Sequence, residues 1–367
     1  MEPYEIVGEV KRFNQRYTAF SRVNWDPTCV ACRTPAKTAD EIAAQRKPGY
    51  SLEDFALHAG AWAMARSLPG AGPGRKSKPD EMEAGEMRLD KRYEPEDWSA
   101  LTRRIKRAAG FFGASAVGVA RVDPRWLYAC DPQERPVELP QGMNTAVVMA
   151  IAMDYKMLRS SPSAWAAAAT GNGYSRMAFV KACLARHLRE LGWNALAAGN
   201  DTALSIPLAI DAGLGEAGRS GLLIMPQYGP RVRLCKVFTD APLLPDAPIR
   251  FGVQEFCEVC KKCAQTCPAG SIPWGEMTAS GPTVSNNPGV LKWYSNADKC
   301  LAFWRANGVS CANCIRSCPF NKPTGRIHDW ARLLVKAGSR LTNRALVRID
   351  DRLGYGRQAP PDNGHPR

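Results

Sequence analysis

Eight cysteines in the last third of the 367-residue sequence have the spacing that iron–sulfur clusters require. The first four are separated by two, two and three residues and are closed by a proline: Cys257, Cys260, Cys263, Cys267 and Pro268. A second block, also closed by a proline, contains Cys311, Cys314 and Cys318, with Cys300 eleven positions before it. The first run is typical of bacterial ferredoxins, and eight thiolates are the number that two 4Fe–4S clusters need.

The two blocks are expected to exchange their outermost ligands. Three thiolates on a short loop converge on one cluster, whereas the cysteine locked by proline begins a helix that points elsewhere. We therefore predict one cluster on Cys257, Cys260, Cys263 and Cys318, and a second on Cys267, Cys300, Cys311 and Cys314. Zinc and disulfides are the alternatives, but zinc ribbons lack the third cysteine of the triplet and disulfides do not need such regular spacing.

Five further cysteines lie outside this region, and two of them, Cys29 and Cys32, form a lone C-x-x-C. No βαβ pattern surrounds this pair, so we interpret both as free thiols, with a redox disulfide or an extra metal as the alternative.

Length and charge bound the class of protein. A chain of 367 residues predicts two or three domains, and 45% hydrophobic residues is normal for a globular core. The sequence has no apolar run of about 20 residues, and its charged start does not resemble a signal peptide. The net charge of +14 is compatible with nucleic acid, an anionic membrane surface or an acidic redox partner, but no nucleic-acid motif supports the first.

The remaining sequence predicts the elements that must position these groups. Hydrophobic patterning and glycine stops indicate helices over residues 52–65, 99–110 and 175–191, and strands over 116–122, 145–153, 221–225 and 232–238. A Gly- and Pro-rich stretch over 67–80 predicts a loop, and the glycine-dense residues 209–221 predict a loop that lets backbone approach a large ligand.

Basic residues recur every four positions in the C-terminal segment: Arg332, Lys336, Arg340, Arg344, Arg348 and Arg352. On a helix they form a basic stripe, which is either a solvated face or a docking surface for a membrane or a partner.

Several short segments, taken in order, resemble the corrinoid-dependent reductive dehalogenases. They are GYSRM at 173–177, GND at 199–201, AIDAGLGEAGRSG at 209–221, PQYGPRVRLCKVFTD at 226–240 and the two cysteine blocks, with NQRY at 14–17 and GAW at 60–62. The resemblance extends from about Asn14 to Lys322.

This resemblance implies an α+β fold, in which a nitroreductase-like α/β core binds a base-off cobalamin or related corrinoid and a bacterial ferredoxin-like domain carries two 4Fe–4S clusters. The implied organisation is an N-terminal region with substrate-pocket elements (1–98), a corrinoid-binding core (99–250), the two-cluster domain (251–325) and a basic tail (326–367). The corrinoid signature D-x-H-x-x-G is absent, as expected where the protein supplies no lower cobalt ligand.

The resemblance also assigns roles to residues. Tyr174 stands at the position of the family's acid, Arg233 at that of the arginine beside it, and Asn200 at that of the asparagine that faces the halogen. Two aromatic residues resemble walls of the substrate pocket, and three glycines of the 209–221 loop are expected at the corrinoid: Trp62 and Trp304, and Gly213, Gly215 and Gly218.

The implied activity is removal of halide from an organohalide with two electrons and one proton, supplied by a low-potential donor. The implied protein is a homodimer, and a small membrane-anchor protein or an anionic membrane is the expected partner of the basic tail. Because no export signal is present, we expect either a processed form on the outer side of the cytoplasmic membrane or a cytoplasmic protein.

Two alternatives remain open. An epoxyqueuosine reductase shares corrinoid and clusters, but its D-Y-H context is not matched, because Asp154 and Tyr155 precede Lys156 here. A ferredoxin-type electron carrier without catalysis is the other.

Overall fold

The computed structural model describes residues 4–67, 92–323 and 325–360. The Gly- and Pro-rich loop predicted over 67–80 lies, after its first residue, outside these ranges. None of the helices in the described ranges is long and apolar enough to cross a membrane.

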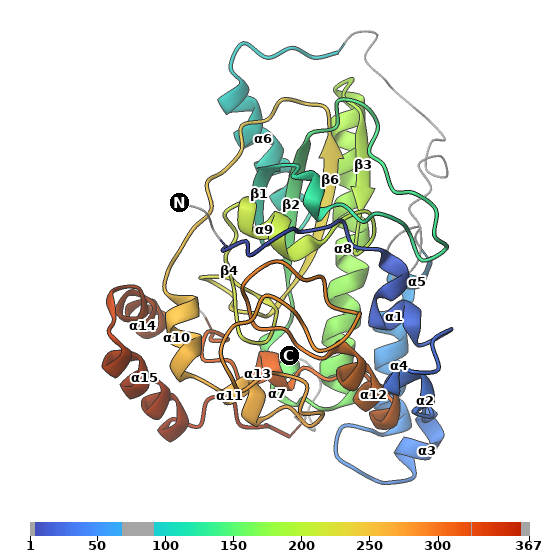
Figure 1. Cartoon of the computed structure of the whole chain (residues 1–367), viewed down its shortest axis with the longest axis vertical. Coiled ribbons are helices and arrows are strands. Elements are labelled where there is room, and N and C mark those ends of the chain that lie inside the picture. Colours follow the sequence, from blue (N-terminus) through green and yellow to red (C-terminus); the bar gives the residue numbers. More distant parts are fainter. Residues whose placement is uncertain (1–3, 68–91, 324, 361–367) are drawn as a thin grey trace.

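A four-stranded antiparallel sheet in the order β1-β2-β6-β3 forms the centre of the molecule (Figure 1). Its strands are β1 (Ala116–Arg121), β2 (Thr145–Ala152), β3 (Ala195–Ala198) and β6 (Val232–Thr239). β2 is buried along nearly its whole length, which explains its continuous apolar sequence. The strands predicted over 116–122, 145–153 and 232–238 are therefore confirmed as β1, β2 and β6 to within one residue at either end, whereas β3 was not predicted.

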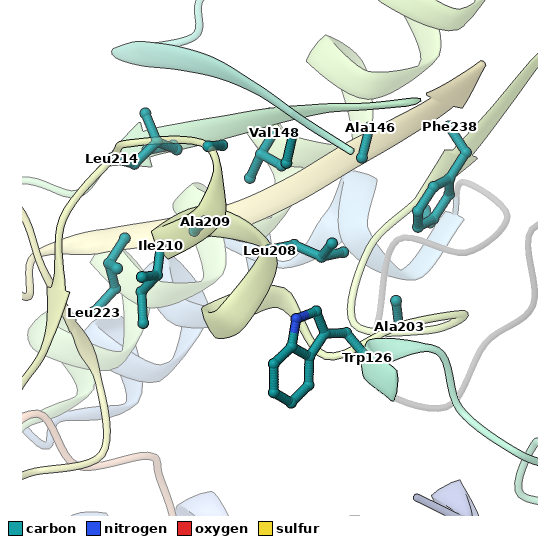
Figure 2. Close-up of a cluster of buried hydrophobic side chains, with 14 of the residues drawn as sticks. Trp126, Ala146, Val148, Ala203, Leu208, Ala209, Ile210, Leu214, Leu223 and Phe238 are labelled. Carbon is teal, nitrogen blue, oxygen red and sulfur yellow. The ribbon is translucent and has the colours of Figure 1, made fainter. Parts of the chain in front are cut away.

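Successive side chains of β2 point to opposite faces of the sheet and pack into two hydrophobic cores. Val147 and Met149 face a core with α6 (Trp98–Phe111) and α8 (Ala164–Glu190). Ala146 and Val148 face the opposite core, formed with α9 (Ser205–Asp211) and η2 (Pro124–Trp126) (Figure 2). The sheet is thus covered by helices on both faces, and the mixed helix and sheet content agrees with the predicted α+β class.

Helix α8 differs from its prediction. A helix was expected from residue 175, but α8 begins at Ala164, and Gly171 and Gly173 lie in its interior. The reason is close packing: a Cβ at Gly171 would lie 2.4 Å from Trp62 Cδ1, and one at Gly173 would lie 3.1 Å from Arg233 Cγ. Tyr174 is therefore a mid-helix residue rather than the start of a helix.

The predicted helix over 99–110 was expected to stop at Gly110, but α6 continues to Phe111. The glycine with a positive φ beyond the end of this helix is Gly113, at +112°, rather than Gly110. A two-stranded sheet, β4 (Glu216–Ala217) with β5 (Leu223–Ile224), folds the glycine-dense segment back on itself.

The N-terminal helices lie beside α8 and the cluster region (Figure 1). They are η1 (Gln15–Tyr17), α1 (Ala19–Arg22), α2 (Val30–Arg33), α3 (Ala39–Ala43), α4 (Leu52–Ala61) and α5 (Ala63–Ser67). The predicted helix over 52–65 is split at Trp62, which caps α4. Buried Arg22 pairs with Asp298 at 2.6 Å and so ties this region to the cluster domain.

The cluster domain is built from short helices joined by irregular segments. They are α10 (Val253–Val259), α11 (Lys262–Gln265), α12 (Ala297–Asn307) and α13 (Asn313–Arg316), and α7 (Tyr155–Arg159) lies against α13. Because the helices are short, the shared apolar core is small, and cysteines contribute to it.

The tail folds into two helices, α14 (Arg326–Ala337) and α15 (Arg340–Arg352), at the edge of the molecule next to α10 (Figure 1). The basic residues that recur every four positions therefore do not lie on one helix, because α14 ends before Gly338 and α15 begins after it. Buried Asp350 pairs with Lys262 and Lys322, so the tail is docked on the cluster domain.

Candidate active site and cluster-binding region

The fold brings together three residues that are far apart in the sequence. Tyr174 lies on α8, Arg233 on β6 and Asn200 in the loop after β3. Asn200 Nδ2 donates a hydrogen bond to Tyr174 Oη at 2.9 Å. The Arg233 guanidinium lies over the Tyr174 ring, with Cζ 5.1 Å from the ring centroid, and its Nη2 donates to Thr170 Oγ1 at 3.3 Å. A phenol, an amide and a fixed positive charge are therefore in contact.

Trp62 completes one wall of this arrangement. Its ring stacks on Tyr174, with centroids 5.1 Å apart and planes inclined by 22°. Such stacking fixes the phenol ring and leaves its hydroxyl as the mobile part.

Trp62, Tyr174 and Arg233 line a cavity of about 550 Å³, which we call the substrate chamber. Trp304 of α12 and Phe20 of α1 close another side, with ring centroids 5.8 Å apart. The structure thus brings Trp62 and Trp304 to the same chamber as Tyr174 and Arg233, whereas Asn200 is not among its lining residues.

The charge of the chamber is one-sided. Its lining side chains include four cations and, among the described residues, no carboxylate: Lys37, Arg66, Arg233 and Arg305. Burial, reinforced by Arg66, lowers the pKa of His58 to about 4, so this imidazole is neutral at pH 7. The chamber therefore favours species that are neutral or that develop negative charge.

Four buried polar atoms of the chamber residues have no hydrogen-bond partner within the described part of the chain: Trp62 Nε1, Arg233 Nε, Trp304 Nε1 and Ser310 Oγ. Buried polar groups are normally satisfied, so this concentration is what a site completed by a bound molecule would show.

A second cavity of about 380 Å³ includes Asn200 in its lining, and we call it the cofactor cavity. Its lining is aromatic, glycine-containing and largely uncharged, with amide and hydroxyl side chains at Asn200, Ser205, Gln254, Ser285, Asn286 and Asn287. One charged side chain, Lys292, lines it among the described residues. Such a surface suits a large ligand that carries amide groups.

The predicted corrinoid glycines have different surroundings. Gly218 lines the cofactor cavity, whereas Gly213 and Gly215 do not. A Cβ at Gly213 would lie 2.5 Å from the Ala247 carbonyl oxygen, and one at Gly215 would lie 2.1 Å from that of Ile224. These two glycines are required by the packing of the chain on itself, and a direct corrinoid contact stays a prediction.

Cysteines of the same predicted ligand set lie near one another. Burial raises the pKa of the Cys318 thiol, and the neighbouring Cys257, Cys260 and Cys263 raise it further. These four cysteines also line one small cavity, which Cys314 joins from the other set. Burial likewise raises the pKa of Cys300 to about 12, with Cys311 and Cys267 as its neighbours. The ligand roles remain predictions, but the proximity needed for them is present.

In the described ranges, no group of three His, Cys, Asp or Glu side chains is arranged to hold a single metal ion. Cys29 is buried and Cys32 partly buried, both as free thiols.

Two buried cations of this region were missed by sequence reasoning. Arg219 donates to the carbonyl oxygens of Cys257 at 2.9 Å, Pro273 at 3.0 Å and Gly275 at 2.7 Å, and so joins the glycine-dense segment to the first cysteine block. Lys236, on β6, is fully buried. The sequence offered one signal for Arg219, which is its place near the end of the glycine-dense segment 209–221.

Family models match two parts of the chain. Residues 129–243 match the reductive dehalogenase subunit family, and residues 256–322 match the 4Fe-4S dicluster domain. The dicluster match contains all eight cysteines, so the presence of a two-cluster domain predicted from their spacing is confirmed.

Similar proteins were found by sequence and by structure. The tetrachloroethene reductive dehalogenase of Sulfurospirillum multivorans is 38% identical over 70% of this chain and 57% of its own length. That of Dehalobacter restrictus is 33% identical over 86% of this chain and 70% of its own. A variant of the catabolic reductive dehalogenase NpRdhA superposes with a TM-score of 0.74 at 26% identity, over 97% of this chain and 48% of that one.

The chain therefore spans little more than half of the Sulfurospirillum protein and about half of the NpRdhA chain. The epoxyqueuosine reductase of Bacillus subtilis is 29% identical over 30% of this chain, a much shorter match.

Proposed function

Because the chain belongs to the reductive dehalogenase family, we propose that it replaces a carbon–halogen bond of a small organohalide with a carbon–hydrogen bond. The balanced reaction is R–X + 2e⁻ + H⁺ → R–H + X⁻. The observation that carries the proposal is the contact of Tyr174, Asn200 and Arg233 beside a cationic chamber, within reach of a two-cluster domain.

The two cavities together would hold a corrinoid. Asn200 lines the cofactor cavity and Tyr174 lines the substrate chamber, and the Asn200–Tyr174 hydrogen bond joins their walls. The amide and hydroxyl side chains of the cofactor cavity are suited to the amide side chains of a base-off corrinoid. When bound, the corrinoid supplies the two-electron chemistry at the carbon–halogen bond.

The eight cysteines would hold the two clusters that deliver electrons from a low-potential donor. The thiols of Cys314 and Cys318 are buried, so their charged thiolate forms need the compensating charge of bound iron.

Tyr174 is the proposed proton donor. A phenol is a weak acid, so its loss of a proton must be made easier by a nearby positive charge or hydrogen-bond donor. Arg233 supplies a permanent charge over the ring, and Asn200 supplies a donor at the phenol oxygen. The other cations of the chamber, Lys37, Arg66 and Arg305, favour the departing halide and help to keep the site free of competing cations.

The test is turnover of a chlorinated ethene by protein loaded with iron and corrinoid under anaerobic conditions. About eight irons and one cobalt per chain are expected. Tyr174→Phe should keep both metals and lose about 10²- to 10⁴-fold in turnover. Arg233→Lys should be nearly as harmful because the planar guanidinium is lost. Because the two residues act on one proton, the double variant should be little worse than either single one.

Unchanged turnover in fully loaded Tyr174→Phe would overturn the assignment of the acid. Protein with clusters but without cobalt or turnover would instead support the electron-carrier alternative. Activity on an epoxyqueuosine-containing RNA, with none on halogenated substrates, would support the epoxyqueuosine reductase alternative.

Helices α14 and α15 of the tail are a second, independent feature. We propose that their outer face binds an anionic lipid surface. Trp330, Leu333 and Leu341 are exposed by 68%, 58% and 75%. The basic residues from Lys336 to Arg352 are exposed beside them. Exposed tryptophan and leucine next to arginine is the composition of interfacial amphipathic helices.

Flotation with anionic vesicles at low salt and at about 0.5 M salt tests this surface, since screening weakens an electrostatic contact. Replacing Arg344 and Arg348 by Gln should reduce binding. Equal recovery with neutral vesicles, or no binding to either, would leave the face as a solvated surface. The expected homodimer stays a prediction.

A further inference from the structure

Lys236 is a charged side chain inside an apolar core. It lies on the central strand β6, in register with Val148 of β2 and Ala198 of β3. It points to the same face as Val232 and Phe238, which belong to the core shown in Figure 2. The side chain is 0% exposed. Burying an ammonium group is costly unless all of its protons are bonded, so its partners define its role.

All three ammonium protons have acceptors, and all three acceptors lie between Gly199 and Ser205, the first residue of α9. Lys236 Nζ donates to the carbonyl oxygens of Gly199 at 2.6 Å and Ala203 at 2.8 Å, and to Ser205 Oγ at 3.0 Å. These residues lie at the two ends of the segment between β3 and α9. The lysine therefore closes this loop at its base.

The loop needs such closure because its backbone is strained. Thr202 has φ +68°, a left-handed conformation that is unfavourable for a β-branched residue. Asp201 supports the turn by accepting from Gly199 N at 2.6 Å, and Gln15 reaches the Asn200 carbonyl at 3.4 Å. The loop is also tied to a neighbouring segment, because Tyr128 N donates to the Thr202 carbonyl oxygen at 3.0 Å and Leu204 N donates to the Trp126 carbonyl oxygen at 2.8 Å. Asn200 itself is exposed.

That tip carries the amide that donates to Tyr174 Oη. We infer that Lys236 is a positioning residue, which sets the Asn200 amide against the Tyr174 hydroxyl by clamping both ends of residues 199–205. This inference rests on the proposed function for its catalytic consequence, but its structural part does not.

Lys236 is not itself placed to act as the acid. Its nitrogen is enclosed and fully engaged with the loop. Burial lowers its pKa to about 8, Asp201 and Cys235 oppose that change, and Lys181 adds to it. The ammonium form, with three donors, is therefore retained at neutral pH, whereas a neutral amine would lose one of the three hydrogen bonds.

Hydrogen–deuterium exchange of the holoprotein tests the clamp without using turnover. Lys236→Gln should increase exchange in peptides that cover residues 196–208, because a neutral amide cannot reach all three acceptors. Ser205→Ala, which removes one of the three, should change the same peptides in the same direction but less. Val148→Ala is the matched control, because it loosens the opposing strand of the same core without touching the loop.

Turnover then tests the link to Asn200. Lys236→Gln should lower kcat by on the order of 10²-fold, as expected for a catalytic group displaced by about 1 Å. In an Asn200→Ala background the same change should cost little, because the group that it positions is already gone. Val148→Ala should affect kcat equally in both backgrounds.

Unchanged exchange over residues 196–208 in both Lys236→Gln and Ser205→Ala would overturn the clamp. Additive losses of kcat in Lys236→Gln and Asn200→Ala would show that the lysine does not act through Asn200. If the wild-type protein had no dehalogenase activity, the proposed function would fail, while the exchange result would still decide the clamp.

Discussion

Gly171 provides a quantitative test of how Trp62 is held against Tyr174. Gly171 lies inside α8, where a Cβ would be 2.4 Å from Trp62 Cδ1 and 2.5 Å from its Nε1. Real Cβ atoms do not approach a ring so closely, so Gly171→Ala must displace the indole or the helix.

Two opposing effects set the expected magnitude. Alanine in a helix interior is favoured over glycine by about 0.5–1 kcal/mol. Overpacking of a well-filled contact costs about 1–3 kcal/mol, and loss of the Trp62–Tyr174 stack costs about 0.5–1.5 kcal/mol more. A net loss of about 0.5–4 kcal/mol in the free energy of unfolding is therefore expected, together with reduced turnover.

Gly110 is the matched control. It also lies inside a helix, α6, but a Cβ there would meet nothing within 4 Å. Gly110→Ala should therefore stabilise by about 0.5–1 kcal/mol. Denaturant unfolding of both variants separates the packing effect from the helix propensity that they share.

A double variant sharpens the test. In a Trp62→Phe background the smaller ring leaves space beside α8, so Gly171→Ala should become neutral or stabilising, like Gly110→Ala. If Gly171→Ala stabilises the wild-type protein as much as Gly110→Ala does, the packing argument is refuted. Equal destabilisation with and without the indole would also contradict it, since the clash would then involve another group.

Three further outcomes are expected. Cys318→Ser should abolish the EPR signal of the cluster on Cys257, Cys260 and Cys263, and Cys311→Ser that of the other cluster; loss of the same signal in both would exclude the exchanged ligands. The folded pKa of His58 lies below its unfolded value near 6.5, so its contribution to stability is present above pH 6.5 and is lost as the pH falls towards 4. Urea titrations at pH 7 and pH 5 should show a loss of at most about 2 kcal/mol that His58→Asn removes; an unchanged loss would contradict this. Asp350→Ala should cost about 3–5 kcal/mol because it leaves buried Lys322 without its carboxylate partner and buried Lys262 with only the exposed Asp351, whereas removal of Asp351 should cost less than about 1 kcal/mol, as unfolding curves would show.

Sequence patterns predicted the parts of this protein that depend on local chemistry. β2 was evident from its continuous apolar sequence, because a strand covered on both faces needs apolar residues throughout. The grouping of Cys318 with the first block followed from the proline after each block, which directs the last cysteine away from its own loop.

Other features depend on contacts between distant segments and leave no local pattern. Gly171 and Gly173 allow Trp62 and Arg233 to approach an uninterrupted helix, and the expected helix over 175–191 did not include them. Lys236 bonds two carbonyl oxygens, and carbonyl groups are the same in every residue, so its role cannot be recognised from sequence. The role of Tyr174 came from the resemblance, since its contact with Asn200 depends on how the loop after β3 folds.

The grouping of the cysteines also has a consequence for biogenesis. On the ligand sets predicted here, the cluster begun first by the growing chain is completed last, because its fourth ligand is Cys318, whereas the second set is complete at Cys314. A nascent chain stopped between these two cysteines could hold one finished cluster and one with an open iron. Insertion of the first cluster must therefore wait until nearly all of the cluster domain has left the ribosome, or it must pass through a three-thiolate stage that oxygen can attack.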